Sequence, residues 1–92
     1  MSYEFKVKIR KHCKKFLKKL SLKDRKQVLS KIRDFRGWLL GENVNVDVKK
    51  LKGEWKGFYR IRTGKIRILL KVYPEDRLII VYDADYRESV YK

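Results

Sequence analysis

The amino-acid sequence predicts an α+β fold in which a two-helix hairpin packs on one face of a sheet. The chain opens with alternating apolar and charged residues, continues with two amphipathic helical segments, and closes with three strand-like segments separated by tight turns. This order is typical of helices packed on one face of an antiparallel sheet. The 92 residues have the length of one domain, and residues 1–92 are expected to form it.

The first strand is predicted over residues 3–9, where apolar and charged side chains alternate without a break. A period of two residues is typical of a half-buried strand. The side chains expected to face the core are Tyr3, Phe5, Val7 and Ile9.

Two helices are predicted next, because from Arg10 the spacing of apolar residues changes to that of a helix. Ser21 is expected to begin the second helix, since Ser21 and Asp24 fit a capping box. Gly41 is expected to end it. The predicted apolar faces are Cys13, Phe16, Leu17 and Leu20 in the first helix, and Val28, Ile32, Phe35 and Leu39 in the second.

A three-stranded meander is predicted over the second half of the chain. Residues 42–57 are expected to form mainly a loop, in which Val44, Val46 and Val48 are candidates for a short strand. The three strands are expected within residues 58–62, 65–73 and 77–82, with turns at Thr63-Gly64 and Pro74-Glu75-Asp76. Connections this short force neighbouring strands to run antiparallel.

The charge of the chain predicts a polyanionic partner. Twenty-six basic residues against 11 acidic ones give a net charge of +15. The alternative is a lysine-rich surface stabilised by ion-pair networks, but such networks need both signs of charge, and acidic residues are scarce. Strongly basic domains commonly bind nucleic acid, and RNA is the partner expected here.

Metal and cofactor chemistry find little support in the composition. Cys13 is the only cysteine and His12 the only histidine, so the sequence predicts no disulfide, no thiolate zinc site, no metal and no cofactor. Cys13 is interpreted as a small buried hydrophobe rather than a nucleophile. The chain lacks an apolar run of membrane-spanning length, and residues 1–6 do not resemble a signal peptide. No membrane association and a cytoplasmic location are therefore expected.

Three arginines are predicted to gather on the sheet face opposite the helices. Tyr59 and Ile61 should point to one side of their strand and Arg60 and Arg62 to the other. The tight turn that follows should bring Arg67 beside them. Arginine binds phosphate bidentately through its planar fork. An ordinary solvated surface is the alternative, and the neighbouring tyrosines are either base-stacking rings or core residues.

Three segments carry a resemblance to a known family: residues 50–53 (Lys-Leu-Lys-Gly), 57–69 (Gly-Phe-Tyr-Arg-Ile-Arg-Thr-Gly-Lys-Ile-Arg-Ile-Leu) and 86–91 (Tyr-Arg-Glu-Ser-Val-Tyr). In their order and spacing, they make the chain similar to the RelE/ParE superfamily of toxins from prokaryotic toxin–antitoxin pairs, over essentially its whole length. For the RelE-like branch, the resemblance implies this small α+β fold and cleavage of mRNA in the ribosomal A site. It also implies an acidic antitoxin, the ribosome and mRNA as partners.

The resemblance further implies which residues form the site. The catalytic set is Arg60, Arg62, Arg67, Arg87 and Tyr91. Tyr91 is expected to act as general base, the three strand arginines as a phosphate clamp, and Arg87 as stabiliser or proton donor. The residues expected to contact RNA are Lys50, Lys52, Lys65, Lys71 and Tyr59. Where the family often has Gly-His-Arg before the final Tyr, this chain has Asp85-Tyr86-Arg87.

Three functions remain open at the level of the sequence. The first, and the one expected, is a metal-independent, ribosome-dependent endoribonuclease toxin. The second is a toxin of the same fold that inhibits DNA gyrase, although such relatives commonly lack the arginine and tyrosine cluster. The third is a non-catalytic RNA-binding protein or a degenerate toxin, which charge alone does not exclude.

Overall fold

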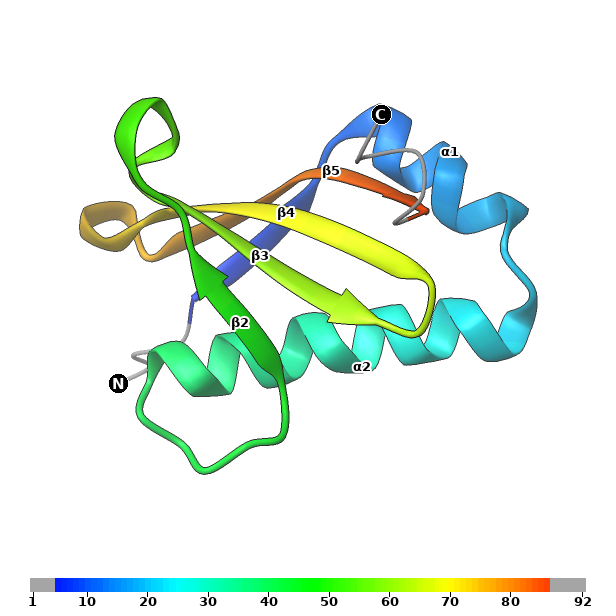
Figure 1. Cartoon of the computed structure of the whole chain (residues 1–92), viewed down its shortest axis with the longest axis horizontal. Helices are drawn as coiled ribbons and strands as arrows, with labels where there is room; N and C mark the ends of the chain where they lie inside the picture. The colour runs from blue at the N-terminus through cyan, green and yellow to red at the C-terminus, as the bar shows by residue number, and fades with distance from the viewer. Residues whose placement is uncertain (1–4, 87–92) are drawn as a thin grey trace.

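The computed structural model describes residues 5–86 and contains two α-helices packed on a mixed five-stranded sheet (Figure 1). The helices are α1 (Lys11–Lys19) and α2 (Leu22–Leu39). The strands are β1 (Lys6–Ile9), β2 (Asp47–Lys50), β3 (Phe58–Thr63), β4 (Ile66–Tyr73) and β5 (Leu78–Tyr86). Short 3-10 turns at Gly53–Trp55 and Pro74–Asp76 precede β3 and β5. The predicted α+β class is confirmed.

The strands lie in the order β1-β5-β4-β3-β2. The meander of β3, β4 and β5 is antiparallel, as its short turns require. By contrast, β1 pairs with β5 in parallel, from Lys6 opposite Leu78 to Ile9 opposite Val81. A parallel pair needs a long crossover, and the two helices lie within that connection. The loop predicted at residues 42–57 also contains β2, in which Val48 is the one valine of the three proposed.

The helices begin and end where the sequence predicts. The hydroxyl of Ser21 accepts a hydrogen bond from the backbone N–H of Asp24 at 3.1 Å, which satisfies a donor of the first turn. At the other end, Gly41 has a φ of 83°, in the left-handed region that favours glycine after a helix. Within residues 5–86, no helix is both long and apolar enough to cross a lipid bilayer.

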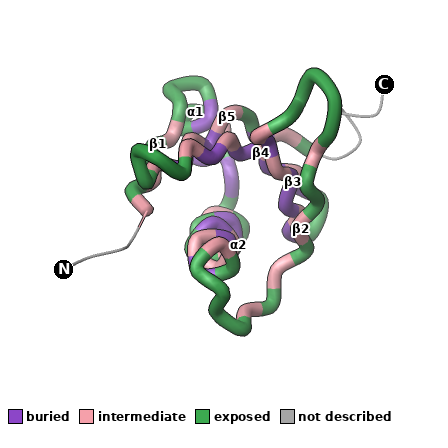
Figure 2. Tube along the Cα trace, turned by 90° about the vertical axis from the view of Figure 1, so that its left-hand side faces the viewer, coloured by how far each residue is buried: buried purple, intermediate pink, exposed green. Residues whose placement is uncertain are grey.

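One continuous core joins both helices to the sheet. Figure 2 shows α2 end-on with the strands β2 to β5 curved around it. The predicted stripe of α2 is buried at Val28, Ile32 and Phe35, and α1 contributes Cys13 and Leu17. The strands supply the other large side chains of this core, which are Ile61, Ile66, Ile68, Leu70, Val72, Ile79 and Val81. The opposite face of the β3–β4–β5 meander is therefore left for polar and aromatic side chains.

A β-bulge in β5 changes which side chains face away from α2. Leu70 pairs with Val81, whereas the preceding Leu69 pairs with Asp83, so β5 has one extra residue at this point. Val81 and Ala84 are both buried in the core. The two residues between them, Tyr82 and Asp83, lie toward the face opposite α2, which we call the open face.

Candidate functional site

The open face brings together the three arginines predicted from the strand pattern. Arg62 of β3 lies directly opposite Arg67 of β4, and Arg60 precedes Arg62 by two residues on the same face. The intervening Ile61 is completely buried on the α2 side. The alternation of side chains along a strand thus accounts for the cluster, and the hairpin turn at Gly64, with a φ of 57°, sets the register.

A cleft of about 420 Å³ lies over this part of the sheet. It is lined by Leu51, Trp55, Arg60, Arg67, Leu69, Asp83, Ala84 and Asp85. The strands β3, β4 and β5 form its floor, and the segment around Trp55 forms a wall. The cleft therefore combines two guanidinium groups, two carboxylates and apolar side chains.

The arginines are held by the sheet rather than extended into solvent. Arg60 is only 9% exposed, and the Nε nitrogens of Arg60, Arg62 and Arg67 are all buried. A terminal nitrogen of Arg60 lies 3.8 Å from a carboxylate oxygen of Asp47, which is itself largely exposed. Fixed guanidinium groups can bind an anion with little further loss of side-chain entropy.

The predicted lysines lie at different distances from this cluster. The ammonium of Lys71 is on the open face, 5.1 Å from the ring centres of both Phe58 and Tyr73. Lys52 is exposed next to the wall of the cleft, and Lys65 is exposed in the β3–β4 turn. Lys50 lies opposite Tyr59 in the sheet, so its register places it on the α2 side.

Tyr59 is not brought to the arginines. Its ring packs 5.4 Å from that of Phe35 and 5.9 Å from that of Trp38, both on α2. Of the two interpretations that the sequence leaves open, the structure supports a core role. The rings on the open face are instead those of Phe58 and Tyr82, whose centres are 5.0 Å apart.

Two predicted catalytic residues, Arg87 and Tyr91, lie outside the described residues. The structure adds three residues that the sequence interpretation did not select. Asp83 and Asp85 line the cleft, and Lys49 lies opposite Arg60 in the sheet. For Lys49 a signal was available, because the alternation of β2 separates it from Lys50; for Asp83 the bulge removes any such signal.

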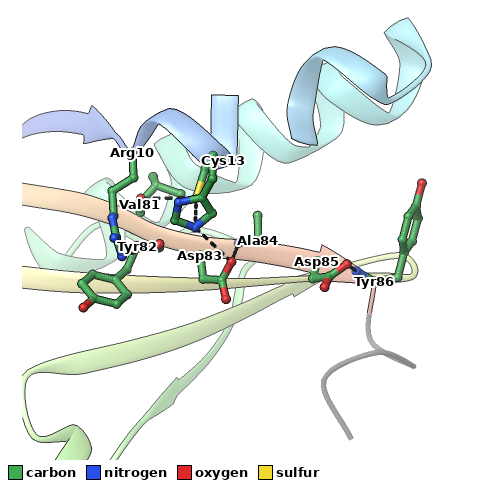
Figure 3. Close-up of polar contacts among 9 residues, drawn as sticks. Arg10, Cys13, Val81, Tyr82, Asp83, Ala84, Asp85 and Tyr86 are labelled. Carbon is green, nitrogen blue, oxygen red and sulfur yellow. Dashed lines mark hydrogen bonds and ion pairs between the residues drawn. The ribbon is translucent and has the colours of Figure 1, made fainter. Parts of the chain in front are cut away.

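A second group of reactive side chains borders the cleft. Nε2 of His12 lies 3.3 Å from Oδ1 of Asp83 and 3.6 Å from Sγ of Cys13. Figure 3 shows Cys13 on α1 above Asp83 on β5. Burial, and secondarily the charge of Asp83, raises the pKa of the Cys13 thiol from 9.0 to about 11, while Arg10 opposes this change. Cys13 is completely buried, which confirms its prediction as a small buried residue.

Comparison with known proteins places the chain beside RelE-type toxins. No family model matches it. It is 44% identical over 46 residues to a curated RelE-type toxin from Methanocaldococcus jannaschii, and the match spans half of this chain and half of that relative. Among solved structures, it resembles a chain of the RelB–RelE antitoxin–toxin complex from Methanococcus jannaschii. That chain is 30% identical, with 92% of this chain and 95% of that chain covered and a TM-score of 0.71.

Two other solved structures have the same fold. One is the archaeal RelE–RelB complex from Pyrococcus horikoshii, with 29% identity, a TM-score of 0.74, and coverage of 91% of this chain and 96% of that chain. The other is a toxin–antitoxin complex from Mycobacterium tuberculosis, with 21% identity, a TM-score of 0.72, and coverage of 91% and 99%. At 21% identity, the second shows the fold alone.

Proposed function

The chain belongs to the RelE family of toxins, and we propose that it is the toxin of a toxin–antitoxin pair and cleaves mRNA on the ribosome. The observation that carries the proposal is the cleft on the open face, where Arg60 and Arg67 converge. Arg62, opposite Arg67, extends the same cationic surface. Planar guanidinium groups held by a rigid sheet suit the oxygens of a phosphodiester.

In the proposed reaction, a ribose 2′-hydroxyl attacks the adjacent phosphorus in line with the leaving 5′-oxygen. Negative charge grows on the phosphate oxygens as the new P–O bond forms. Arg60, Arg62 and Arg67 would stabilise this charge, and because they are already fixed, little reorganisation is needed at the transition state. Arginine charge can serve in place of a metal ion here, so we propose metal-independent cleavage.

Proton transfers complete the reaction. We retain Tyr91 as the general base that accepts the 2′-hydroxyl proton, and Arg87 as stabiliser or donor to the leaving oxygen. Positive charge near a tyrosine favours its phenolate form, which suits this role. The carboxylate of Asp85 also lines the cleft, and it is a second candidate for the base.

The partners are proposed on the same basis. The similar structures from Methanococcus jannaschii and Pyrococcus horikoshii are complexes of RelE with RelB. An excess of 15 positive charges suits both an acidic antitoxin and ribosomal RNA, and electrostatic steering would speed both associations. Ribosomes as the site of action would place the protein in the cytoplasm, with residues 1–92 acting as one toxin domain.

The proposal is tested in a cell-free translation reaction by mapping mRNA 5′ ends with primer extension. Wild type is compared with Arg67→Ala, Tyr91→Phe and the control Arg33→Ala, which removes an equal charge from the exposed side of α2. We expect ribosome-dependent cuts with wild type and the control, and loss of cleavage with the other two. Cleavage lost only in Arg67→Ala would remove Tyr91 as base.

Intact mRNA with every protein would contradict the proposal. Normal protein synthesis would then direct attention to DNA gyrase, and retained RNA affinity without cleavage would indicate a non-catalytic RNA-binding protein. Cuts that appear equally in free RNA would show a general ribonuclease instead of a ribosome-dependent one.

A further inference from the structure

Three metal-binding side chains converge beside α1. His12 and Cys13 come from its first turn, and Asp83 comes from the bulged part of β5. One potential ligand atom from each residue lies within 4.8 Å of the other two. They meet because β1 ends opposite Val81, so α1 borders β5 beyond that point. The thiol of Cys13 donates to the carbonyl of Val81 at 3.6 Å, which fixes it there (Figure 3).

The spacing of these atoms matches the edges of a tetrahedral zinc site. With ordinary bond lengths to zinc, a sulfur and a nitrogen ligand lie about 3.6 Å apart, and a nitrogen and an oxygen ligand about 3.4 Å apart. The observed distances are 3.6 Å from Sγ of Cys13 to Nε2 of His12, and 3.3 Å from that nitrogen to Oδ1 of Asp83. The third pair, Sγ of Cys13 and Oδ1 of Asp83, lies within 4.8 Å, against about 3.6 Å in such a site, so a modest movement of the side chains would allow an ion to bind between them.

Hydrogen bonding accounts only in part for the two short contacts of His12. Both short contacts of His12 fall on the same ring nitrogen. Because the thiol proton of Cys13 goes to the carbonyl of Val81, this nitrogen can contact Sγ only as a donor, and its single N–H would then be shared between the sulfur and the carboxylate. An ion bound between the three groups would replace both contacts at once.

We propose that His12, Cys13 and Asp83 form a binding site for a divalent transition metal, with Zn²⁺ as the best-matched ion. Nitrogen, sulfur and oxygen ligands of this kind are those that Zn²⁺ takes in proteins. Three protein ligands leave the fourth position open to water or another small ligand.

Charge and access also favour a cation. A thiolate and a carboxylate together carry two negative charges, and the thiol proton is released to solvent when Sγ binds the metal. The side chains of His12 and Asp83 are 51% and 58% exposed, so an ion can reach the site from solvent. The positive charge of Arg10 reaches Cys13 and opposes a cation there, although its guanidinium packs on the ring of Tyr82, 4.2 Å from the centre, and donates to the carbonyl of the same residue.

Metal binding would also change the charge of the cleft. Asp83 belongs to both groups, since it lines the cleft with Arg60 and Arg67. A bound Zn²⁺ would neutralise this carboxylate and leave the arginines with less competition for phosphate. This consequence rests on the proposed function, whereas the metal site does not, and the ion takes no part in the cleavage step.

The site is tested on the purified full chain, reduced and freed of metal. Isothermal titration calorimetry with Zn²⁺ measures the stoichiometry and affinity of binding. In the Co²⁺-bound protein, visible absorption bands indicate tetrahedral coordination, and a thiolate-to-metal charge-transfer band indicates that Sγ of Cys13 is a ligand. The variants are His12→Gln, Asp83→Asn and Cys13→Ser. Asp85→Asn is the control, because it removes the same charge from the same strand and the same cleft.

We expect one Zn²⁺ per chain, a charge-transfer band with Co²⁺, and unchanged binding in Asp85→Asn. Loss of an outer-sphere partner alone costs about 10–100-fold in metal affinity, so loss of a direct ligand in His12→Gln or Asp83→Asn should cost at least about tenfold. Both positions are half-exposed, so these variants should fold even if Cys13→Ser is destabilised. Absent binding, a missing charge-transfer band, or equal losses in Asp83→Asn and Asp85→Asn would overturn the proposal.

Discussion

Replacing Arg67 by alanine should weaken RNA binding far more than an equal loss of charge elsewhere. The three arginines of the open face are expected to neutralise three phosphates. For single-stranded RNA, the logarithm of the binding constant should therefore fall with the logarithm of salt concentration, with a slope of about −2 or steeper. Loss of one such contact should reduce the slope by about 0.7. A charge-assisted hydrogen bond contributes about 1.5–3 kcal/mol, which corresponds to about 10- to 150-fold in affinity.

Two matched variants separate this prediction from general attraction to a basic surface. Arg67→Lys keeps the charge but loses the planar fork, so the slope should stay while affinity falls by an intermediate amount. Arg33→Ala removes one charge from exposed α2, so affinity and slope should stay close to wild type. The assay is fluorescence anisotropy with a non-cleavable 2′-O-methyl RNA oligonucleotide at several salt concentrations. Equal effects of Arg67→Ala and Arg33→Ala would refute a localised arginine site.

Asp85→Asn should tighten binding of the same oligonucleotide, most clearly at low salt, because it removes a carboxylate opposite Arg67; unchanged affinity would contradict a role of this charge in the cleft. Phe35→Ala should lower the free energy of unfolding by about 3–5 kcal/mol in urea titrations, since Phe35 is completely buried, and a loss below about 1 kcal/mol would argue against the described core. For Cys13, the raised pKa means that its contribution to stability is complete below pH 9 and falls as the pH rises toward about 11. Wild type should therefore lose stability relative to Cys13→Ala across that range, and parallel curves for the two proteins would contradict it.

Much of the fold could be predicted because local patterns and tertiary structure agree. The stripe of Val28, Ile32 and Phe35 is buried as its spacing requires. Ser21 caps α2 as its side chain permits. The short turns of the meander require antiparallel pairing of its strands. The parallel pairing of β1 with β5 was not predictable in this way, because it joins segments separated by both helices.

In the candidate site too, local sequence patterns place some residues correctly and miss others. The alternation along β3 was sufficient to place Arg60 and Arg62 together, and the turn added Arg67. The carboxylate of Asp83 could not be placed, since in a regular strand it would share the buried side of Val81. The β-bulge reverses this, and nothing in the local sequence marks where β5 takes up its extra residue.

The contact of His12 and Cys13 with Asp83 depends on the same bulge and on the packing of α1 against β5. His12 and Asp83 are 71 positions apart in the chain. Composition alone argued against a metal site, because it counts one cysteine and one histidine without showing that a carboxylate lies beside them. Such sites become visible only when the register of the sheet is known.

In the proposed reaction, the open-face arginines promote attack of a 2′-hydroxyl on the adjacent phosphate. The most direct measurement is single-turnover cleavage of a defined mRNA on programmed ribosomes, with analysis of the product ends. The wild-type protein should leave a 2′,3′-cyclic phosphate and should not cut an mRNA with one 2′-deoxy nucleotide at the cleaved position. The Arg67→Ala variant should have lost the activity. A 3′-hydroxyl product, or full cleavage of the 2′-deoxy substrate, would rule out attack by the 2′-hydroxyl.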